Sequence, residues 1–168
     1  MNTSLLKKFA LAALLAGTLL NTQAALKVGD PLPDLAGFKL EGTLPDSLKG
    51  KVVILDFWAS WCGPCAESFP IMDALQKKYK DQGLVIVAVS VDEKADKMAT
   101  FMKKNPVSFT IVRDAQQKLV AVAEPATMPT SFIIDRAGKV HFLHNGFHGA
   151  ATQKEYVEEI EALLKATP

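Results

Sequence analysis

Two long, mainly apolar segments, residues 51–58 and 84–91, dominate the hydrophobic pattern of this chain. The second is a continuous apolar run, which is typical of a strand buried on both faces of a parallel sheet. Shorter apolar segments predict further strands at residues 109–112, 131–134 and 140–143. Turn-forming residues 135–139 separate the last two segments, which indicates a hairpin. The pattern therefore predicts a central β-sheet.

Apolar residues recur at helical spacing between these segments and again near the C-terminus. The expected helices cover residues 67–80, 93–104 and 115–122, and a final segment from Thr152 onward. Pro70 is expected to kink the first helix, and Gly83 to end it. Thr152 and Glu155 form a predicted capping box for the last helix. The apolar stripe of that helix consists of Tyr156, Ile160, Leu163 and Leu164.

Strands alternate with helices along most of the chain, and a hairpin and a helix follow. This order predicts an α/β fold with a mixed central sheet and helices on both faces. Residues 28–33 are expected to be extended, and residues 38–40 and 43–44 to form an N-terminal hairpin around Glu41 and Gly42. The chain of 168 residues contains no repeat or linker, so we expect one domain at residues 25–168.

Residues 1–24 are expected to be a signal peptide rather than part of the fold. Lys7 and Lys8 precede an apolar stretch at residues 9–20, and small residues at 22–24 provide a cleavage site. The apolar stretch is shorter than the roughly 20 residues of a transmembrane helix, although an uncleaved anchor remains an alternative. Cleavage removes two of 19 basic residues and no acidic one, leaving a formal net charge of −1. This charge does not favour nucleic-acid binding.

The only two cysteines, Cys62 and Cys65, are three residues apart, directly after the first long apolar segment. A helix is predicted to start there, so its dipole and free N–H groups favour a thiolate at Cys62. Cys65 is one helical turn further on, close enough to form a disulfide with Cys62. An exported protein meets an oxidising compartment, but a bridge across so short a loop constrains the unfolded chain little. The pair is therefore predicted to be a working dithiol.

Other interpretations of the cysteines remain open. They include a static bridge and half of a zinc site, although a zinc site of the usual spacing needs a second pair of ligands. A copper-binding protein would use both cysteines and one histidine. The candidate histidines are His141, His144 and His148. A peroxidase of the peroxiredoxin type is disfavoured, because those enzymes resemble a Thr-x-x-Cys pattern and this chain has Ala59 at the threonine position.

Several motifs of the chain resemble the TlpA/ResA-like exported thiol-disulfide oxidoreductases, which have a thioredoxin-like fold. The central motif is Leu-Asp-Phe-Trp at residues 55–58 followed by Trp-Cys-Gly-Pro-Cys at residues 61–65. Met-Pro-Thr at residues 128–130, the segments at 28–34 and 48–51, and an inserted helix and strand within residues 93–112 extend the likeness. The resemblance covers nearly all of the mature chain.

The resemblance implies roles for individual residues. Cys62 is the expected nucleophile that forms a mixed disulfide with a partner protein, and Cys65 resolves it. Asp56 is the expected buried acid that takes a proton from Cys65. Pro129 is expected to be a cis proline that faces the cysteines. The implied substrate-binding surface consists of Trp61, Gly63, Pro64, Met128, Pro129 and Thr130.

The chain departs from the TlpA/ResA-like pattern at two positions. Many members have a glutamate three residues after the second cysteine, where this chain has Ser68, and Glu67 points elsewhere on the helix. Many members also lack the acid that Asp56 supplies. Proton transfer is therefore expected to resemble that of cytoplasmic thioredoxins. Trp58 is expected to be a core residue.

The expected function is disulfide exchange with exported proteins, in the reducing direction, because the Gly63-Pro64 dipeptide resembles that of reducing thioredoxins. The expected location is the periplasm, and cytochrome c maturation proteins are possible targets. We expect a membrane electron donor, a monomeric protein, no cofactor, no metal and no nucleic acid. A disulfide oxidase or isomerase of exported proteins is the main alternative.

Overall fold

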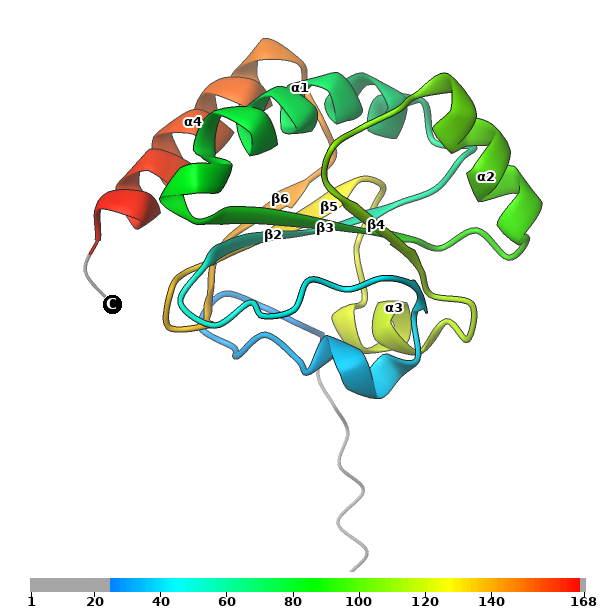
Figure 1. Ribbon diagram of the computed structural model, residues 1–168, viewed down its shortest axis with the longest axis horizontal. Coiled ribbons are helices and arrows are strands. Elements are labelled where there is room, and N and C mark those ends of the chain that lie inside the picture. The colour runs from blue at the N-terminus through cyan, green and yellow to red at the C-terminus, as the bar shows by residue number, and fades with distance from the viewer. Residues whose placement is uncertain (1–24, 167–168) are drawn as a thin grey trace, which may run out of the picture.

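The computed structural model describes residues 25–166 and contains a six-stranded mixed sheet with helices on both faces (Figure 1). The strands are β1 (Glu41–Gly42), β2 (Val52–Trp58), β3 (Leu84–Ser90), β4 (Thr110–Arg113), β5 (Thr130–Ile134) and β6 (Val140–Asn145). The α-helices are α1 (Gly63–Tyr79), α2 (Ala95–Lys104), α3 (Lys118–Ala123) and α4 (Ala150–Lys165). Two 3₁₀ helices, η1 (Leu35–Phe38) and η2 (Lys80–Gln82), complete the elements. The predicted signal peptide lies outside the described residues.

The sheet has the strand order β1-β4-β3-β2-β5-β6. Strands β2, β3 and β4 are parallel, while β5 runs antiparallel to β2, and β6 antiparallel to β5. The hairpin predicted around residues 135–139 is therefore confirmed. In this register Asp56 of β2 lies opposite Ala88 of β3 on one side and Ser131 of β5 on the other. Asp56 thus occupies the centre of the sheet.

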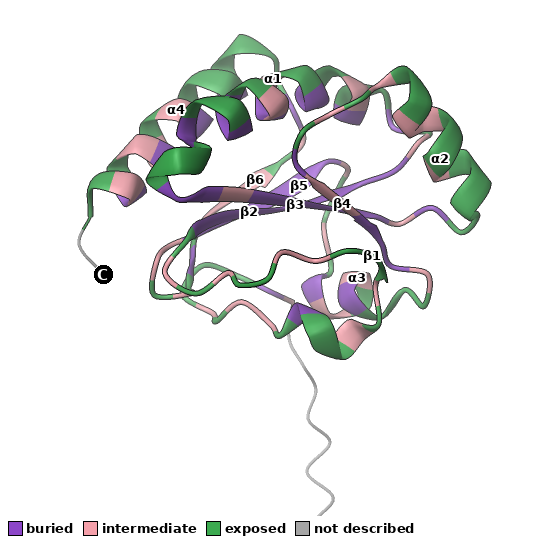
Figure 2. Cartoon of the chain, viewed as in Figure 1, coloured by how far each residue is buried: buried purple, intermediate pink, exposed green. Residues whose placement is uncertain are grey.

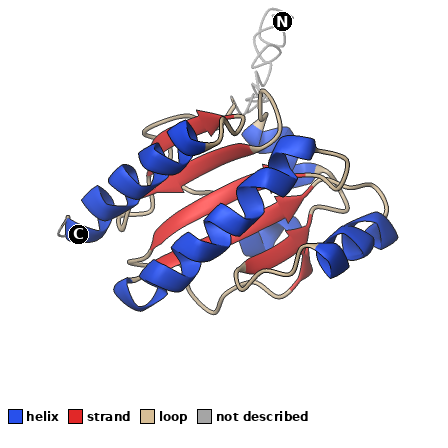
Figure 3. Cartoon of the chain, turned by 90° about the horizontal axis from the view of Figure 1, so that it is seen from above, coloured by secondary structure: helices blue, strands red, loops and turns tan. Residues whose placement is uncertain are grey.

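Strand β2 is buried along its whole length, and its alternate residues enter two separate cores. Val52, Ile54 and Trp58 pack with α1 and α4, whereas Val53, Leu55 and Phe57 pack with α3 and the N-terminal segment. Helices α1, α2 and α4 cover one face of the sheet and α3 the other (Figures 1 and 3). The buried residues of α1 and α4 lie on the sides that face the sheet (Figure 2). Helices on both faces explain why the long strands show no alternation.

The predicted N-terminal hairpin is wrong. Leu35–Phe38 forms η1 instead, and Lys39 adopts a left-handed conformation with φ 53°. Glu41 and Gly42 then form β1, which pairs antiparallel with β4 rather than with a neighbouring segment. The Arg113 guanidinium binds the Glu41 carboxylate at 2.7 Å. Gly42 has φ +120° and lies so close to β4 that a Cβ atom would be 2.9 Å from the Ile111 carbonyl oxygen. A long-range ion pair and a close backbone contact thus replace the local turn.

The predicted capping box of the last helix is also wrong. Helix α4 begins at Ala150, two residues earlier than expected, after Gly149 with φ 62°. Thr152 therefore lies inside the first turn, where its hydroxyl accepts a hydrogen bond from the His148 N–H at 3.1 Å. Glu155 approaches His144 of β6 rather than the helix terminus. The predicted stripe is correct, since Tyr156, Ile160 and Leu163 are buried and Leu164 packs against them.

Candidate active site

Cys62 and Cys65 form a disulfide at the N-terminus of α1. Cys62 is the N-cap residue, and its Sγ atom accepts a hydrogen bond from the Cys65 N–H at 3.2 Å. The helix starts four residues earlier than predicted, directly after Cys62, which confirms the expected position of the cysteine. Cys62 keeps 6% of its surface exposed, and Cys65 has none. A partner can therefore reach Cys62 but not Cys65.

The residues around the cysteines favour this local structure. The Cys62 N–H donates to the Ala59 carbonyl, which closes a turn between β2 and the helix. Pro64 occupies the first turn of α1, where its missing N–H leaves no helical hydrogen bond unmade. The N–H groups of a helix start are otherwise unpaired, so they stabilise negative charge on the Cys62 sulfur. The geometry supports a thiolate nucleophile at Cys62 once the disulfide is reduced.

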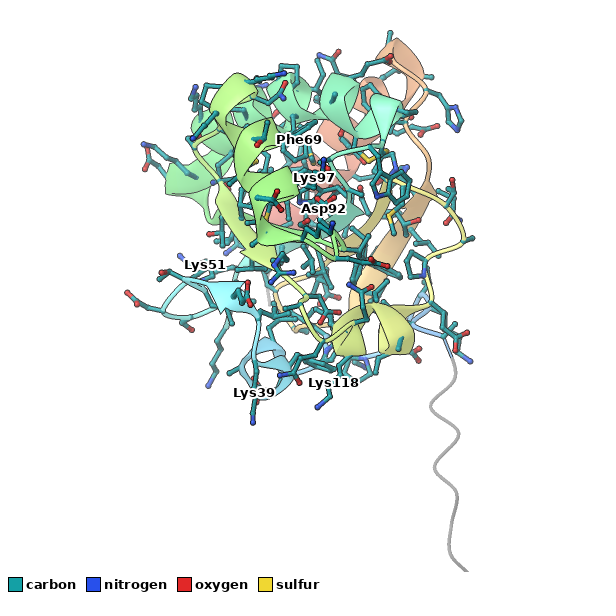
Figure 4. The ribbon with its side chains drawn as sticks, turned by 90° about the vertical axis from the view of Figure 1, so that its right-hand side faces the viewer. Lys39, Lys51, Phe69, Asp92, Lys97 and Lys118 are labelled. Carbon is teal, nitrogen blue, oxygen red and sulfur yellow. A yellow bond between two sulfur atoms is a disulfide. The ribbon has the colours of Figure 1, made fainter. Side chains whose placement is uncertain are left out.

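Asp92 anchors the loop that carries Trp61 and Cys62, a role that the sequence did not suggest. It lies two residues after the end of β3 and is labelled in Figure 4. Its carboxylate accepts hydrogen bonds from the Ser60 N–H at 3.0 Å and hydroxyl at 2.7 Å. The Ser90 hydroxyl donates to the same carboxylate at 2.8 Å. The Arg113 guanidinium in turn binds the Asp92 carbonyl. The one signal in the sequence is a Ser-x-Asp pattern at the end of a buried strand.

Replacing Asp92 by alanine is expected to lower the free energy of unfolding by about 2–3 kcal/mol, because three buried or half-buried donors lose their acceptor. Urea unfolding measures this loss. The alkylation rate of Cys62 in the reduced protein should also change, since its loop is released. Asp73→Ala is the matched control, because Asp73 accepts two hydrogen bonds from Ser108 away from the cysteines. An unchanged alkylation rate in Asp92→Ala would show that Asp92 does not hold the loop.

Asp56 is completely buried at the centre of the sheet. Its Oδ1 atom accepts a hydrogen bond from the Ser131 hydroxyl at 2.5 Å, while Oδ2 has no partner among the described residues. Burial raises the pKa of the Asp56 carboxyl to about 7, and the Ser131 hydrogen bond opposes part of that rise. The carboxyl therefore exchanges a proton in the neutral range. A buried acid with such a pKa is suited to general acid-base chemistry.

A groove of about 440 Å³ runs beside the disulfide. One side consists of Trp61, Cys62, Gly63 and Pro64, and the other of Pro125, Thr127 and Met128. Trp61 is 72% exposed, which is unusual for so large an apolar side chain in this structure. The Met128–Pro129 peptide bond is cis, as the resemblance implied.

Four residues of the predicted substrate surface line this groove, namely Trp61, Gly63, Pro64 and Met128. Pro129 and Thr130 are buried and do not line it. The Thr130 hydroxyl donates to the Thr127 carbonyl at 2.8 Å and so shapes the loop behind the groove. Pro125 and Thr127 were not predicted, although the prolines at 125 and 129 indicated a loop there.

Ser68, which stands where many relatives have glutamate, is buried, and its hydroxyl donates to the Cys65 carbonyl at 3.0 Å. Glu67 is exposed. Ser68 thus supports the helix turn of Cys65 and offers no carboxyl for proton transfer. Trp58 is buried as predicted, with its ring 4.8 Å from that of Phe69.

Two of the three histidine side chains pair with carboxylates. His144 approaches Glu159 at 2.6 Å, and His141 approaches Asp135 at 3.6 Å. Within residues 25–166, no three histidine, cysteine, aspartate or glutamate side chains are grouped so that they could hold a metal ion. The ligand set that the copper alternative requires is therefore not assembled in this part of the chain.

Comparisons with known proteins agree with this geometry. The chain matches the Redoxin family over residues 27–161. It is 36% identical over 117 residues to the thiol-disulfide oxidoreductase ResA of Bacillus cereus, with 68% of each chain covered. It is 41% identical over 109 residues to ResA of Bacillus subtilis, covering 65% of this chain and 59% of that one.

A solved structure from Chlorobium tepidum, assigned to the thiol:disulfide interchange protein DsbE, is similar over most of this chain. Its TM-score is 0.76 at 41% identity, over 83% of this chain and 99% of that chain. These likenesses establish the thioredoxin-like fold and the class of enzyme. The chain therefore belongs to the Redoxin family and is a thiol-disulfide oxidoreductase of the TlpA/ResA-like group.

Proposed function

We propose that this enzyme acts as a reductase of disulfides in exported proteins. The observation that carries the direction is the complete burial of the Asp56 carboxyl, which the resemblance implies lies beneath the cysteines. A carboxylate disfavours a nearby thiolate, and a dithiol whose reduced form is poorly stabilised has a low reduction potential. Strongly oxidising relatives, in contrast, stabilise their reduced form. The Gly63-Pro64 dipeptide between the cysteines supports the same direction.

The reaction begins when the Cys62 thiolate attacks a disulfide of the partner protein. A bond forms between Cys62 Sγ and one partner sulfur, and the other partner sulfur leaves as a thiolate that takes up a proton. Cys65 then loses its proton to Asp56 Oδ2, which has no hydrogen-bond partner within residues 25–166. The Cys65 thiolate attacks Cys62 Sγ and releases the second partner sulfur. The partner gains two electrons, and the Cys62–Cys65 disulfide of the structure is the oxidised product.

The partner is expected to bind in the groove beside the disulfide. Its walls are mostly apolar and include the exposed Trp61 ring, so an extended segment of a protein around its own cysteine fits this surface. Gly63 and Pro64 border the sulfur, and the Met128 side lies across from them. Cytochrome c maturation proteins, which contain Cys-x-x-Cys-His motifs, are one candidate substrate class, and misoxidised exported proteins another.

Residues 1–24 are proposed to direct export to the periplasm, with residues 25–168 forming the working domain. The described part of the chain has no helix that is long and apolar enough to cross a membrane. A membrane protein is proposed to return electrons to the oxidised enzyme, and the enzyme is proposed to act as a monomer.

The reduction potential of the Cys62–Cys65 pair tests the direction. The protein is equilibrated in graded thiol-disulfide buffers, and free thiols are counted by mass after alkylation. We expect a potential near that of reducing thioredoxins, about −270 mV. Asp56→Asn should raise the potential above pH 7, because it removes the carboxylate that opposes the thiolate.

Two results would overturn the proposal. A potential near the oxidising extreme of the superfamily, about −120 mV, would favour a disulfide oxidase or isomerase. A pair that does not titrate in any of the buffers would be a static bridge.

A further inference from the structure

Asp56, Ser131 and Tyr156 form a chain of buried side chains from separate elements. Ser131 of β5 pairs with Asp56 of β2 in the antiparallel register, and Tyr156 belongs to α4. The Ser131 Oγ atom lies 2.5 Å from Asp56 Oδ1 and 2.7 Å from the Tyr156 hydroxyl oxygen. All three residues are at most 1% exposed. The disulfide exchange steps above use Asp56 alone, so Ser131 and Tyr156 lack a role.

The number of hydrogens determines the direction of these hydrogen bonds. An ionised carboxylate can only accept, so the single Ser131 hydroxyl hydrogen must point to Asp56 Oδ1. The Ser131 oxygen is then an acceptor, and the Tyr156 hydroxyl donates to it. Burial, together with the charge of Asp56, raises the pKa of Tyr156 well above its usual range, so Tyr156 keeps its hydrogen. Both hydroxyl dipoles therefore point toward the carboxylate.

We propose that Ser131 and Tyr156 are positioning residues that stabilise the carboxylate form of Asp56 through Oδ1 and leave Oδ2 to accept the proton of Cys65. This inference rests on the proposed proton-accepting role of Asp56. The Ser131 and Tyr156 hydroxyls stand where a cationic side chain would otherwise be needed beside the buried carboxylate. A carboxylate in an apolar core normally needs a charged partner, and here two neutral hydroxyls in series supply the donor.

Other titratable groups lie on the elements packed around Asp56. The cysteine pair lies at the N-terminus of α1, α4 contributes Tyr156 with Glu155 and Glu159 beside it, and β3 places the uncharged Ala88 opposite Asp56. On β6, His144 lies with its ring 4.9 Å from that of Tyr156 and binds Glu159. His144 thus contacts Tyr156 and a neighbouring carboxylate at once, and His144→Asn controls for its contribution.

Direct titration of Asp56 tests the inference without reference to activity. The reduced full chain is labelled with ¹³C at the aspartate carboxyls, and the signal that disappears in Asp56→Asn is followed from acid to alkaline pH. Ser131→Ala should shift the midpoint upward by about one pH unit, because the carboxylate loses its hydrogen bond. Tyr156→Phe should shift the midpoint in the same direction by less, because it weakens the Ser131 donor without removing it.

The resolving step gives a second readout. A glutathione mixed disulfide on Cys62 is prepared, and the rate at which Cys65 releases glutathione is measured across the pH range. A midpoint raised by one unit should slow release about fivefold near neutral pH and leave the alkaline rate unchanged. A merely structural defect would slow release at every pH.

Tyr79→Phe is the matched control for Tyr156→Phe. Tyr79 is also buried, and its hydroxyl donates to Glu161 at 2.6 Å near the far end of α1. The Tyr79→Phe substitution should leave the midpoint of the Asp56 titration unchanged. If Ser131→Ala does not fold, Tyr156→Phe carries the test, since it removes a single oxygen atom.

Two different failures can be distinguished. An unchanged Asp56 midpoint in the folded Ser131 and Tyr156 variants would overturn this inference, whatever the kinetics of Asp56→Asn. If Asp56→Asn releases glutathione like the unmodified protein at every pH, the proposed proton transfer itself is wrong.

Discussion

Cys62→Ser is expected to abolish disulfide exchange, whereas Cys65→Ser is expected to accumulate covalent complexes with partner proteins. A serine hydroxyl at position 62 cannot form a mixed disulfide, so the reaction does not start. With serine at position 65, attack by Cys62 still occurs, but no thiol in the chain can resolve the product. Non-reducing gels of exported extracts, followed by mass spectrometry of the slow bands, measure the trapped complexes.

The double variant Cys62→Ser/Cys65→Ser is the control for non-specific association, and it should trap nothing. Equal trapping by Cys62→Ser and Cys65→Ser would contradict the assigned order of attack, because the exposure of Cys62 and the burial of Cys65 predict only one nucleophile. The partners identified in the complexes would also define the substrate class.

Asp56→Asn is expected to slow turnover at neutral pH and at the same time to stabilise the protein above neutral pH. The carboxyl titrates near 3.8 in the unfolded chain and at about 7 in the folded protein. Because the folded-state pKa is the higher one, the contribution of Asp56 to stability is complete at acid pH and is lost as the pH rises through 7. The buried carboxylate therefore lowers the free energy of unfolding by up to roughly 4 kcal/mol at alkaline pH.

Urea unfolding of the oxidised protein at about pH 5 and about pH 8.5 measures this difference. The gain in the free energy of unfolding that Asp56→Asn gives should be larger at the higher pH. Asp73→Asn is a control with the opposite sign. Although burial opposes it, hydrogen bonds from Lys77 and Ser108 lower the pKa of Asp73, so its carboxyl is ionised at both pH values and Asp73→Asn should lose the same stability at each. A gain for Asp56→Asn that is equal at both pH values would refute the raised pKa.

The strands, the helices and the cysteine site could be predicted because their signals are local. The continuous apolar character of residues 84–91 required burial on both faces, and Gly-Pro after Cys62 suited a helix start. The failures concern long-range contacts. Glu41 and Gly42 pair with β4, where Arg113 lies about 70 positions further along the chain. The local pattern gave no sign of that contact, and the turn-forming residues around Gly42 suggested a local hairpin instead.

In the candidate site too, local signals could be read from the sequence and long-range contacts could not. Asp56 stood out as an acid in an apolar strand, but Ser131 and Tyr156 did not, because neither belongs to a motif. A serine in a strand and a tyrosine in a helical stripe are ordinary core-facing residues until the sheet register and the packing of α4 bring their hydroxyls to one carboxyl. Asp92 was missed for the same reason, since its hydrogen-bond partner Ser60 is distant in sequence.

The short strand β1 has a consequence for association between molecules. A sheet that ended at β4 would expose a row of unpaired backbone groups, to which a second chain could add a strand. Glu41 and Gly42 cover part of that row, and the absence of a side chain on Gly42 allows them to lie close to it. At this edge of the sheet, β1 thereby limits the addition of a strand from another chain, including a second copy of this one.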